Sequence, residues 1–538
     1  MSFSQIPASQ LTQQLMGMLG SQALQSGLFL ASQDFGFSAP SLHEIGPDEL
    51  RTRLEGHLEN NERARVLAYQ FLERMAGERV VRPWDPEAGG DVYERGLRYS
   101  AAWPGGNTVI LPSKPLNTVV GYSPGIGRVC EAIHEDPERM YELTGRDRTV
   151  LIASDSSGVL GYGDMARHAV LGVLHGKGNI AQSLAGLNFV PHLLPKVNAA
   201  DQESIDRAIE SVLLQEPQAG AIMVEDVGTP HCFPLVDQLA RKASVPTFQD
   251  DQGGTAMVTL SGLTNALEIQ GKKKEDCTYV INGAGAAGDA IVKLLREWGV
   301  SLDQIYVLDS SGVLHTGRDY SSVKDRHKAA YARKTDLRTL SEVMRGADVF
   351  IGVSKKDVVT VEMLKSMAEK PVIFALANPD PEIPAKIAQE ARPDAIVATG
   401  RSDDPIQINN AAIYPYFVSG ALMARAASFN VAMQMAAVET AVQVARQGIT
   451  ADVAGVYGPQ NPVYGGWLVF PSLWDSRLAG TMPIAVAEAA IRSGVAQAKN
   501  FDAEEQRRRL LKRIRFVQEY SRFLDSWTDG ILREDAQR

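Results

Sequence analysis

The sequence predicts an α/β protein with a doubly wound parallel-sheet dinucleotide-binding domain, an α/β catalytic domain, and helical N- and C-terminal regions. Short apolar runs alternate with helical patterns from Thr149 onward, the order typical of parallel sheets joined by crossover helices. A glycine-rich turn at 283–288 directly follows one apolar run and directly precedes a helical pattern. With 538 residues, the chain is long enough for about three or four domains.

Composition excludes several classes of protein. The chain has 54 Lys and Arg against 64 Asp and Glu, so no overall positive charge favours nucleic acid or an anionic membrane. Cys130, Cys232 and Cys277 form no CxxC pair, which argues against a disulfide framework or a cysteine zinc site. The first fifty residues contain no Lys or Arg, and no uncharged apolar run reaches about 18 residues. We therefore expect a cytoplasmic protein that binds neither nucleic acid nor membrane.

Residues 1–113 are expected to form a loose N-terminal arm followed by a helical and loop region. Up to about residue 40 the chain is rich in Gln, Ser and Gly, whereas residues 47–76 place apolar side chains at helical spacing. Residues 77–114 are dense in Pro, Gly and Trp, which suits loops and short strands. No pattern in this region indicates chemistry.

Residues 114–276 are expected to form the domain that binds metal and substrate. The runs TVLIAS (149–154) and AIMV (221–224) predict strands, and the patterns at 165–175 and 233–243 predict helices. This alternation indicates a parallel sheet with crossover helices.

Residues 277–410 are expected to form the dinucleotide-binding domain. Five short apolar runs have doubly wound spacing: TYVIN, QIYVLD, ADVFIGVS, PVIFALANP and AIVATG. Residues 411–538 are expected to be a helical region that completes the catalytic domain, beginning with an Ala-rich helix over 411–447. Apolar residues interrupt the basic run at 507–515 with helical spacing, which favours a packed helix with a charged face over a nucleic-acid site.

The turn at 283–288 has the pattern G-x-G-x-x-G, with Gly283, Gly285 and Gly288 at the glycine positions and Ala286 and Ala287 before the last. The first glycine makes the strand-to-helix turn, and the second lets the backbone approach a pyrophosphate. The helix N-terminus then supplies free N–H groups and a partial positive charge. We expect a dinucleotide site here, the alternative being a glycine turn needed only for packing.

Asp309 ends the next predicted strand, where a carboxylate would accept hydrogen bonds from the ribose hydroxyls of the adenosine. No Lys or Arg follows it until Arg318, so a 2′-phosphate would meet like charge without an adjacent cation. This pattern predicts NAD, with NADP the less favoured cofactor. Arg318, or the pair Lys355 and Lys356, could fold back over the ribose and reverse that preference.

Four carboxylates stand at the ends of two predicted strands. Glu225 and Asp226 close the run AIMV, and Asp250 and Asp251 follow VPTFQ. Because neighbouring parallel strands end at one edge of a sheet, these groups are expected to converge and to repel one another unless a cation lies between them. Oxygen donors favour Mg²⁺ or Mn²⁺ over zinc. Solvated loop acids are the alternative interpretation.

Eight segments, in order between Leu116 and Ala496, resemble the malic enzyme family. They are YSPGIGRVCEAI (122–133), SDSSGVLGYGD (154–164), HGKGNIAQSLAG (175–186), VEDV with PHCF (224–233), FQDDQGGTA (248–256), INGAGAAG (281–288), FALANPDPEIP (374–384) and GRSDDPIQINNAAIYP (400–415). The DDQGGTA and NPDPEIP segments resemble the shorter bacterial type. The resemblance implies metal-dependent oxidative decarboxylation of malate to pyruvate and CO₂ with reduction of NAD, in a homo-oligomer.

The resemblance also implies roles for individual residues. Lys177 would take the hydroxyl proton, Tyr122 would protonate the enol carbon, and Asp250 would tune the lysine. The metal ligands would be Glu225, Asp226 and Asp251. The amides that hold the substrate carboxylate would be Asn378, Asn409 and Asn410, with Asn378 also next to the nucleotide.

Three departures from the family pattern affect substrate recognition. One is the segment MARHAVLGVLHG (165–176), which stands where the family usually has a Gly/Pro-rich version. The longer type has an Arg where this chain has Gly158, so the partner of the distal carboxylate is unassigned, with Arg167 a candidate. The family usually has His or Gln where this chain has Gly253. Two alternatives stay open: a malolactic-type conversion of malate to lactate, and a non-catalytic relative that binds a nucleotide or an acid.

Overall fold

The computed structural model describes residues 8–21, 47–61, 64, 68, 125–159, 162–401, 404, 406–450, 453–454, 463–465 and 468–536. The chain divides into two compact units, one of Met1–Gly106 with Glu519–Arg538 and the other of Asn107–Gln518. Both candidate sites lie in the second unit. In the part of the chain that is described, no helix is both long and apolar enough to cross a membrane. The predicted division into four domains stays a prediction.

The first unit contains a helix that was expected to be part of a loose arm. Helix α1 (Ala8–Ser21) packs against α3 (Pro47–Asn60). Leu11 and Leu15 on α1 and Leu54 and Leu58 on α3 are buried, four residues apart in each helix. The prediction of a loose arm is therefore wrong for residues 8–21. Two apolar side chains one helical turn apart are enough to hold a helix in place when a partner helix covers them. The helical prediction over 47–76 is confirmed for Pro47–Asn60.

In the second unit, the residues described from 125 onward form two short helices and then a four-stranded sheet. The helices are α7 (Gly125–Glu135) and α8 (Met140–Leu143). All strand pairs are parallel, in the order β2-β1-β3-β4. The strands are β1 (Thr149–Ser154), β2 (Asn188–Leu193), β3 (Ala221–Val224) and β4 (Thr247–Gln249), and the helices between them are α9 (Leu171–Ala185), α10 (Gln202–Leu213) and α11 (Cys232–Lys242).

One strand of this sheet, β2, was not predicted, and one of its helices was predicted at the wrong position. Strand β2 contains Pro191, which cannot donate a ladder hydrogen bond, and the structure accordingly places β2 at the sheet edge. The helix expected at 165–175 lies at Leu171–Ala185. Its three glycines weaken the helical pattern. One of them, Gly178, allows α9 to pack closely on β2, since a Cβ there would lie 3.4 Å from Phe189 Cβ.

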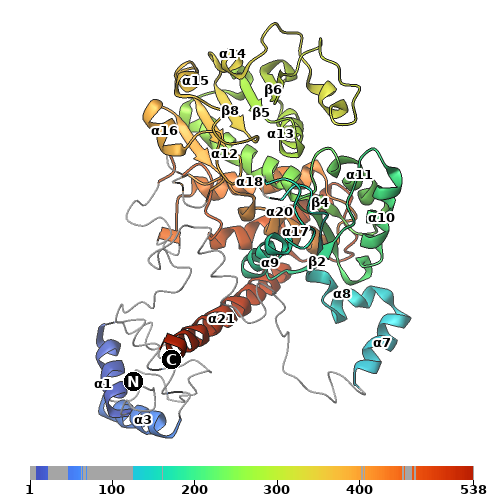
Figure 1. Ribbon diagram of the computed structural model, residues 1–538. Coiled ribbons are helices and arrows are strands. Elements are labelled where there is room, and N and C mark those ends of the chain that lie inside the picture. Colours follow the sequence, from blue (N-terminus) through green and yellow to red (C-terminus); the bar gives the residue numbers. More distant parts are fainter. Residues whose placement is uncertain are drawn as a thin grey trace. The chain divides into compact units, whose positions relative to one another are not determined.

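A six-stranded sheet follows, in the order β10-β9-β8-β5-β6-β7, and Figure 1 shows it flanked by helices on both faces. All pairs are parallel except β6 with β7. The strands are β5 (Tyr279–Asn282), β6 (Ile305–Asp309), β7 (Gly312–Val313), β8 (Val349–Gly352), β9 (Val372–Ala375) and β10 (Ile396–Thr399). The helices are α12 (Thr255–Gln270), α13 (Ala286–Glu297), α14 (Leu340–Met344), α15 (Val361–Lys365) and α16 (Ala385–Ala391).

The two sheets share one hydrophobic core. Alternate residues of β1 and β5, including Val150, Ile152 and Ile281, belong to a single buried cluster. Helix α12 lies within it and is buried almost all round, whereas α10 and α11 cover the other face of the first sheet and α14–α16 the other face of the second. The predicted fold class, an α/β protein with a doubly wound dinucleotide-binding domain, is confirmed.

The C-terminal region of this unit is helical, as predicted, with α17 (Tyr414–Ala424), α18 (Val431–Arg446), α20 (Ser476–Arg492) and the beginning of α21 (Ala503–Ala536). The single helix expected over 411–447 is wrong. Arg425 ends α17 in the left-handed region at φ 49°, where its guanidinium lies 4.0 Å from the ring centre of Tyr141 and bonds Glu138. Contacts with distant residues thus break the helical run.

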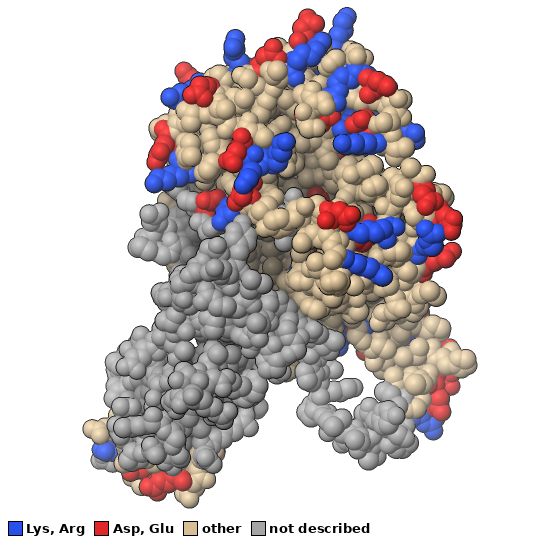
Figure 2. All heavy atoms as spheres, in the orientation of Figure 1, with Lys and Arg blue, Asp and Glu red and all other residues tan. Residues whose placement is uncertain are grey.

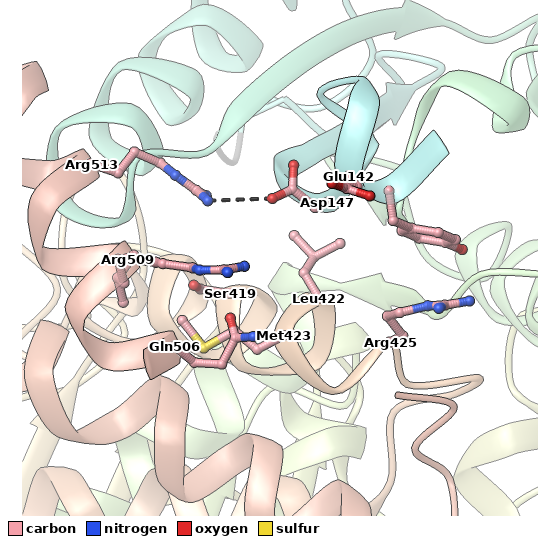
Figure 3. Close-up of a pocket in the computed structure, with 11 residues that line it drawn as sticks. Glu142, Asp147, Ser419, Leu422, Met423, Arg425, Gln506, Arg509 and Arg513 are labelled. Carbon is pink, nitrogen blue, oxygen red and sulfur yellow. Dashed lines mark hydrogen bonds and ion pairs between the residues drawn. The ribbon is translucent and has the colours of Figure 1, made fainter. Parts of the chain in front are cut away.

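The basic run on α21 forms a packed helix, as predicted. Leu510 and Ile514 are buried, whereas Leu511 is exposed. A cavity of about 300 Å³ lies beside them, and Figure 3 shows Arg513 paired with Asp147 there at 3.4 Å. On the part of the face that Figure 2 colours by charge, basic and acidic side chains are interspersed.

Candidate active site

The predicted carboxylate cluster forms at the ends of β3 and β4, which are parallel neighbours. One ligand oxygen from each of Glu225, Asp226 and Asp251 lies within 4.8 Å of the others. Asp251 Oδ2 accepts a hydrogen bond from the backbone N–H of Asp226 at 3.0 Å. Glu225 and Asp226 are almost fully buried, so these are not solvated loop acids.

The cluster fits a hard divalent cation. Glu225 Oε2 is buried without a hydrogen-bond partner. Burial raises the pKa of Glu225 well above its usual range, and although Lys177 works in the opposite direction, Asp251 and Asp250 add to the rise. Such a set of buried oxygens is costly unless a positive charge compensates it, and oxygen donors match Mg²⁺ or Mn²⁺.

Lys177 extends from α9 into this cluster. Its Nζ lies 2.8 Å from Glu225 Oε1, donates to Asp250 Oδ2, and lies 5.1 Å from the ring centre of Tyr414. Burial by itself would lower the pKa of Lys177, but Asp250 and Glu225 outweigh burial and raise that pKa well above its usual value. The structure therefore brings the predicted proton acceptor and the predicted metal ligands together.

Asp250 is held from two sides. It begins a π-helical turn, Asp250–Gly254, and its Oδ2 accepts a hydrogen bond from Asn410 Nδ2 at 2.5 Å in addition to that from Lys177. Gly254 makes room for this carboxylate, since a Cβ there would lie 1.9 Å from Asp250 Oδ1. Asn410 and Gly254 thus position Asp250 against Lys177.

Replacement of Gly254 by alanine is expected to displace Asp250 and reduce turnover at this site by roughly ten- to a hundredfold. The backbone at Gly254 is helical, with φ −62° and ψ −50°, so alanine strains no dihedral angle. The effect comes from the contacts of the new Cβ with the Asp250 carboxylate and with Asn410 Cβ, which would lie 3.2 Å away. Steady-state kinetics measure the loss. Gly480→Ala on α20, where a Cβ meets nothing within 4 Å, is the matched control and should keep wild-type kinetics.

The other predicted substrate amides lie nearby. Asn409 caps a short 3₁₀ turn, with its Oδ1 accepting from Ala411 N at 2.9 Å and its Nδ2 donating to Gly400 O at 3.0 Å. Asn378 follows β9, and its Oδ1 would lie 3.5 Å from a Cβ on Gly400. The two side chains therefore flank Gly400, while the amide of Asn410 faces Asp250. Tyr122 lies outside the described residues.

Two of the departures from the family pattern, Gly253 and Gly158, have structural reasons. A Cβ at Gly253 would lie 2.4 Å from Phe248 Cε2, so the Phe248 ring fills the space that a larger side chain would need. A Cβ at Gly158 would lie 3.1 Å from the backbone of Gly228. Arg167, the candidate for the distal carboxylate, donates to the carbonyl of Leu193 at the end of β2.

The glycine-rich turn joins β5 to α13, as predicted. Gly283 has φ 133°, and a Cβ there would lie 2.5 Å from Val353 O. Gly288 packs against the same turn, with a Cβ 1.8 Å from Gly283 O. Thr229, which no sequence pattern singled out, accepts a hydrogen bond from the N–H of Ala286 at 3.0 Å and so connects the turn to the loop after β3.

A cavity of about 670 Å³ lies at this turn, lined by the loops after β5, β6 and β8. The loops after β8 and β9 are joined by Glu382, which is fully buried. Its carboxylate accepts hydrogen bonds from the backbone N–H groups of Ser354 at 2.8 Å and Ala377 at 3.1 Å. Glu382 thereby connects the nucleotide cavity to the Asn378 loop, a role that no sequence pattern indicated.

The surroundings of Asp309 differ from those on which the prediction of NAD depends. Asp309 ends β6, as predicted, but the expectation that it lacks an adjacent cation is wrong. Arg318 pairs with both of its carboxylate oxygens, at 3.0 and 2.7 Å, and Lys328 Nζ lies 2.8 Å from Oδ2. The chain folds back after β7, which places these cations beside the carboxylate.

Comparison with known proteins identifies two matching family models. "Malic enzyme, N-terminal domain" matches residues 110–198, and "Malic enzyme, NAD binding domain" matches residues 252–457. The crystal structure of malic enzyme from Pyrococcus horikoshii covers 82% of this chain and 100% of its own, with a TM-score of 0.71 and 29% identity.

Two curated relatives differ in the nucleotide that their names state. The NADP-dependent malic enzyme of Halomonas elongata is 38% identical over 405 residues, 74% of this chain and 94% of the relative. The NAD-dependent malic enzyme of Rhizobium meliloti is 37% identical over 422 residues, 77% of this chain and 54% of the relative. The chain thus spans about half the length of several curated relatives that it matches. It belongs to the malic enzyme family.

Proposed function

We propose that the chain catalyses the oxidative decarboxylation of malate to pyruvate and CO₂ with reduction of NAD(P). The observation that carries this proposal is the contact of Lys177 with Glu225 and Asp250 inside a buried cluster of carboxylates. A protein that only binds acids or nucleotides needs no lysine base among metal-type ligands. The family membership supports the same reaction.

Glu225, Asp226 and Asp251 would hold a Mg²⁺ or Mn²⁺ ion. When bound, the nicotinamide supplies a hydride acceptor and the cation supplies Lewis acidity for loss of the β-carboxylate. Lys177 takes the proton of the C2 hydroxyl, for which it must be a neutral amine. Asp250 and Glu225 raise the pKa of Lys177 and so favour its charged form. A cation bound at Glu225 would offset the charge of that carboxylate and thereby favour the neutral amine.

The remaining residues orient and complete the reaction. Asp250 fixes the direction of the lysine amine through the bond to Nζ, and Asn410 fixes Asp250. We assign the substrate carboxylate to the amides of Asn378 and Asn410, with Asn409 supporting the loop. Tyr122 returns a proton to the enol carbon, as the family resemblance implies. A cytoplasmic homo-oligomer stays a prediction from the sequence.

A spectrophotometric screen of malate and related 2-hydroxy acids against both nucleotides, with and without Mn²⁺, tests the proposal. We expect reduced nucleotide and pyruvate to form from malate only when the metal is present. Lactate without net reduction of nucleotide would indicate the malolactic reaction instead. Nucleotide binding without any conversion of malate would indicate a non-catalytic relative.

A further inference from the structure

Tyr414 lies against both ends of Lys177, the predicted base. Its hydroxyl donates a hydrogen bond to the backbone carbonyl of Lys177 at 2.9 Å, and its ring centre lies 5.1 Å from Lys177 Nζ. Tyr414 is fully buried, and a buried phenol needs a hydrogen-bond partner. Because that partner is a main-chain atom of α9, the bond does not depend on the charge of the lysine amine.

The segment that carries Tyr414 also carries the amide that fixes Asp250. Tyr414 is the first residue of α17, and the 3₁₀ turn η10 (Asn410–Ala412) lies just before it in the chain. Asn410 Nδ2 donates to Asp250 Oδ2, and Lys177 Nζ donates to the same oxygen. Residues 410–414 therefore hold the lysine at two points, through Asp250 at the amine and through Tyr414 at the main chain.

The packing around Tyr414 fixes the position of its ring. The ring centre of Phe189 on β2 lies 6.1 Å from that of Tyr414, with an interplanar angle of 47°. Gly178, next to Lys177 in α9, packs on Phe189, since a Cβ there would lie 3.4 Å from Phe189 Cβ. Pro415 stands in the first turn of α17, where its fixed φ suits a helix start. Three elements, α9, β2 and α17, thus set the place of the phenol.

Tyr414 is suited to positioning and not to proton transfer. Burial raises the pKa of Tyr414 well above its ordinary value, and although Lys177 acts in the opposite direction, Asp250 and Glu225 add to the rise. The hydroxyl therefore keeps its proton and donates it to the carbonyl. The lysine needs such support because its four-carbon stem is flexible. A base must lie within hydrogen-bond reach of the proton that it removes, and a displacement of about 1 Å can cost a factor of about 100 in rate.

We propose that Tyr414 is a positioning residue for Lys177, whose hydroxyl anchors the main chain of α9 and whose ring restricts the conformations of the lysine side chain. The amine is thereby held toward the carboxylate cluster. The inference rests on the proposed function and deepens it, since it names a residue on which the removal of the hydroxyl proton depends.

Tyr414→Phe removes the hydroxyl and keeps the ring, so the anchor is lost while the core stays filled. We expect kcat for malate oxidation to fall roughly five- to twentyfold, and KM for malate to change by less than about twofold. Decarboxylation of added oxaloacetate should change by less than about twofold, because it needs no proton removed from a hydroxyl group. Tyr414→Leu, which also removes the ring, should lower kcat by roughly a further five- to tenfold. Steady-state kinetics at saturating Mn²⁺ and nucleotide measure these changes.

A second measurement reports on the lysine without any turnover. Methyl acetimidate modifies amines, and mass spectrometry of the peptide that contains Lys177 gives the rate of modification at that residue in the presence of Mn²⁺. The side chain of Lys177 is 14% exposed, so the wild-type protein should react slowly. Tyr414→Phe should raise the rate at least about threefold, because a lysine released from its fixed position reaches solvent more often.

Tyr416→Phe is the matched control. Tyr416 lies two residues further along α17 and is also buried. Burial raises the pKa of Tyr416, and Asp475 at the N-cap of α20 adds to the rise, so this hydroxyl lies on the side of α20 and not beside α9. The variant loses the same atom from the same helix, and it should keep wild-type kinetics and wild-type labelling of Lys177.

The outcomes separate this inference from the proposed function. Equal losses of malate oxidation and of oxaloacetate decarboxylation in Tyr414→Phe would overturn the positioning role, because a general loss of structure affects both reactions. Unchanged kinetics together with unchanged labelling of Lys177 would overturn it as well. Faster labelling in Tyr414→Phe, in a protein that does not oxidise malate even as wild type, would support the positioning role while contradicting the proposed reaction.

Discussion

Replacement of Asp251 by alanine is expected to lower metal-dependent malate oxidation by more than roughly a hundredfold, since loss of a group that only supports a metal ligand already costs ten- to a hundredfold. Asp251 supplies one of the three clustered ligand oxygens, and it also accepts the backbone N–H of Asp226. Nucleotide affinity should stay within about threefold, because the glycine-rich turn belongs to the other sheet.

Two titrations check this expectation. Mn²⁺ dependence of the rate reports on the carboxylate cluster, and quenching of protein fluorescence by reduced nucleotide reports on the cavity at the glycine-rich turn. Asp237→Ala is the matched control, since Asp237 lies on α11 in the same sheet layer, is exposed, and pairs with Arg241 one helical turn away. An equal loss of nucleotide affinity in the Asp251 variant would contradict two separate sites.

Replacement of Lys177 is expected to separate the two halves of the reaction. Lys177→Ala should reduce malate oxidation by roughly 10²- to 10⁴-fold, because this step needs removal of the hydroxyl proton. Metal-assisted decarboxylation of added oxaloacetate requires no such removal, so its rate should fall much less. Parallel assays of the two reactions, each at saturating Mn²⁺, measure the difference.

The alanine variant also leaves Glu225 and Asp250 without their cationic partner, and breaking a buried pair in this way costs about 3–5 kcal/mol of folding free energy. Lys177→Arg separates the loss of the base from the loss of the charge. Arginine keeps the positive charge but cannot serve as a proton acceptor, so this variant should retain the thermal midpoint and still lose malate oxidation. If both reactions fell by the same factor in Lys177→Arg, the lysine would act in binding or structure instead of proton transfer.

Local patterns in the sequence were sufficient for the main architecture and for the metal cluster. Apolar runs of strand length, alternating with helical patterns, indicated both sheets because parallel strands must be joined by crossovers. Glu225 and Asp251 could be placed together from the sequence, since neighbouring parallel strands end at one edge. The turn at 283–288 could also be predicted from its glycines, because close backbone packing there excludes a side chain.

Other features depended on contacts between distant parts of the chain. Strand β2 was not predicted because it contains Pro191, and a proline fits a sheet only at its edge. Whether a strand lies at the edge is decided by the assembled sheet. Arg425 ends the first helix of the Ala-rich run, because its guanidinium lies over the ring of Tyr141 and pairs with the carboxylate of Glu138. Gly253 departs from the family pattern because the ring of Phe248 fills its space.

By itself, the sequence determined the parallel strands other than β2, the position of the glycine-rich turn, and the strand ends that carry Glu225, Asp226, Asp250 and Asp251. Tertiary structure alone decided the charge at the adenosine end of the cavity. Lys328 lies 19 residues beyond Asp309 and reaches it because the 3₁₀ helix η9 (Arg326–Tyr331) docks on the turn between β5 and α13. The interaction energy of two charges depends on their distance in space, and the spacing of residues along the chain does not specify that distance.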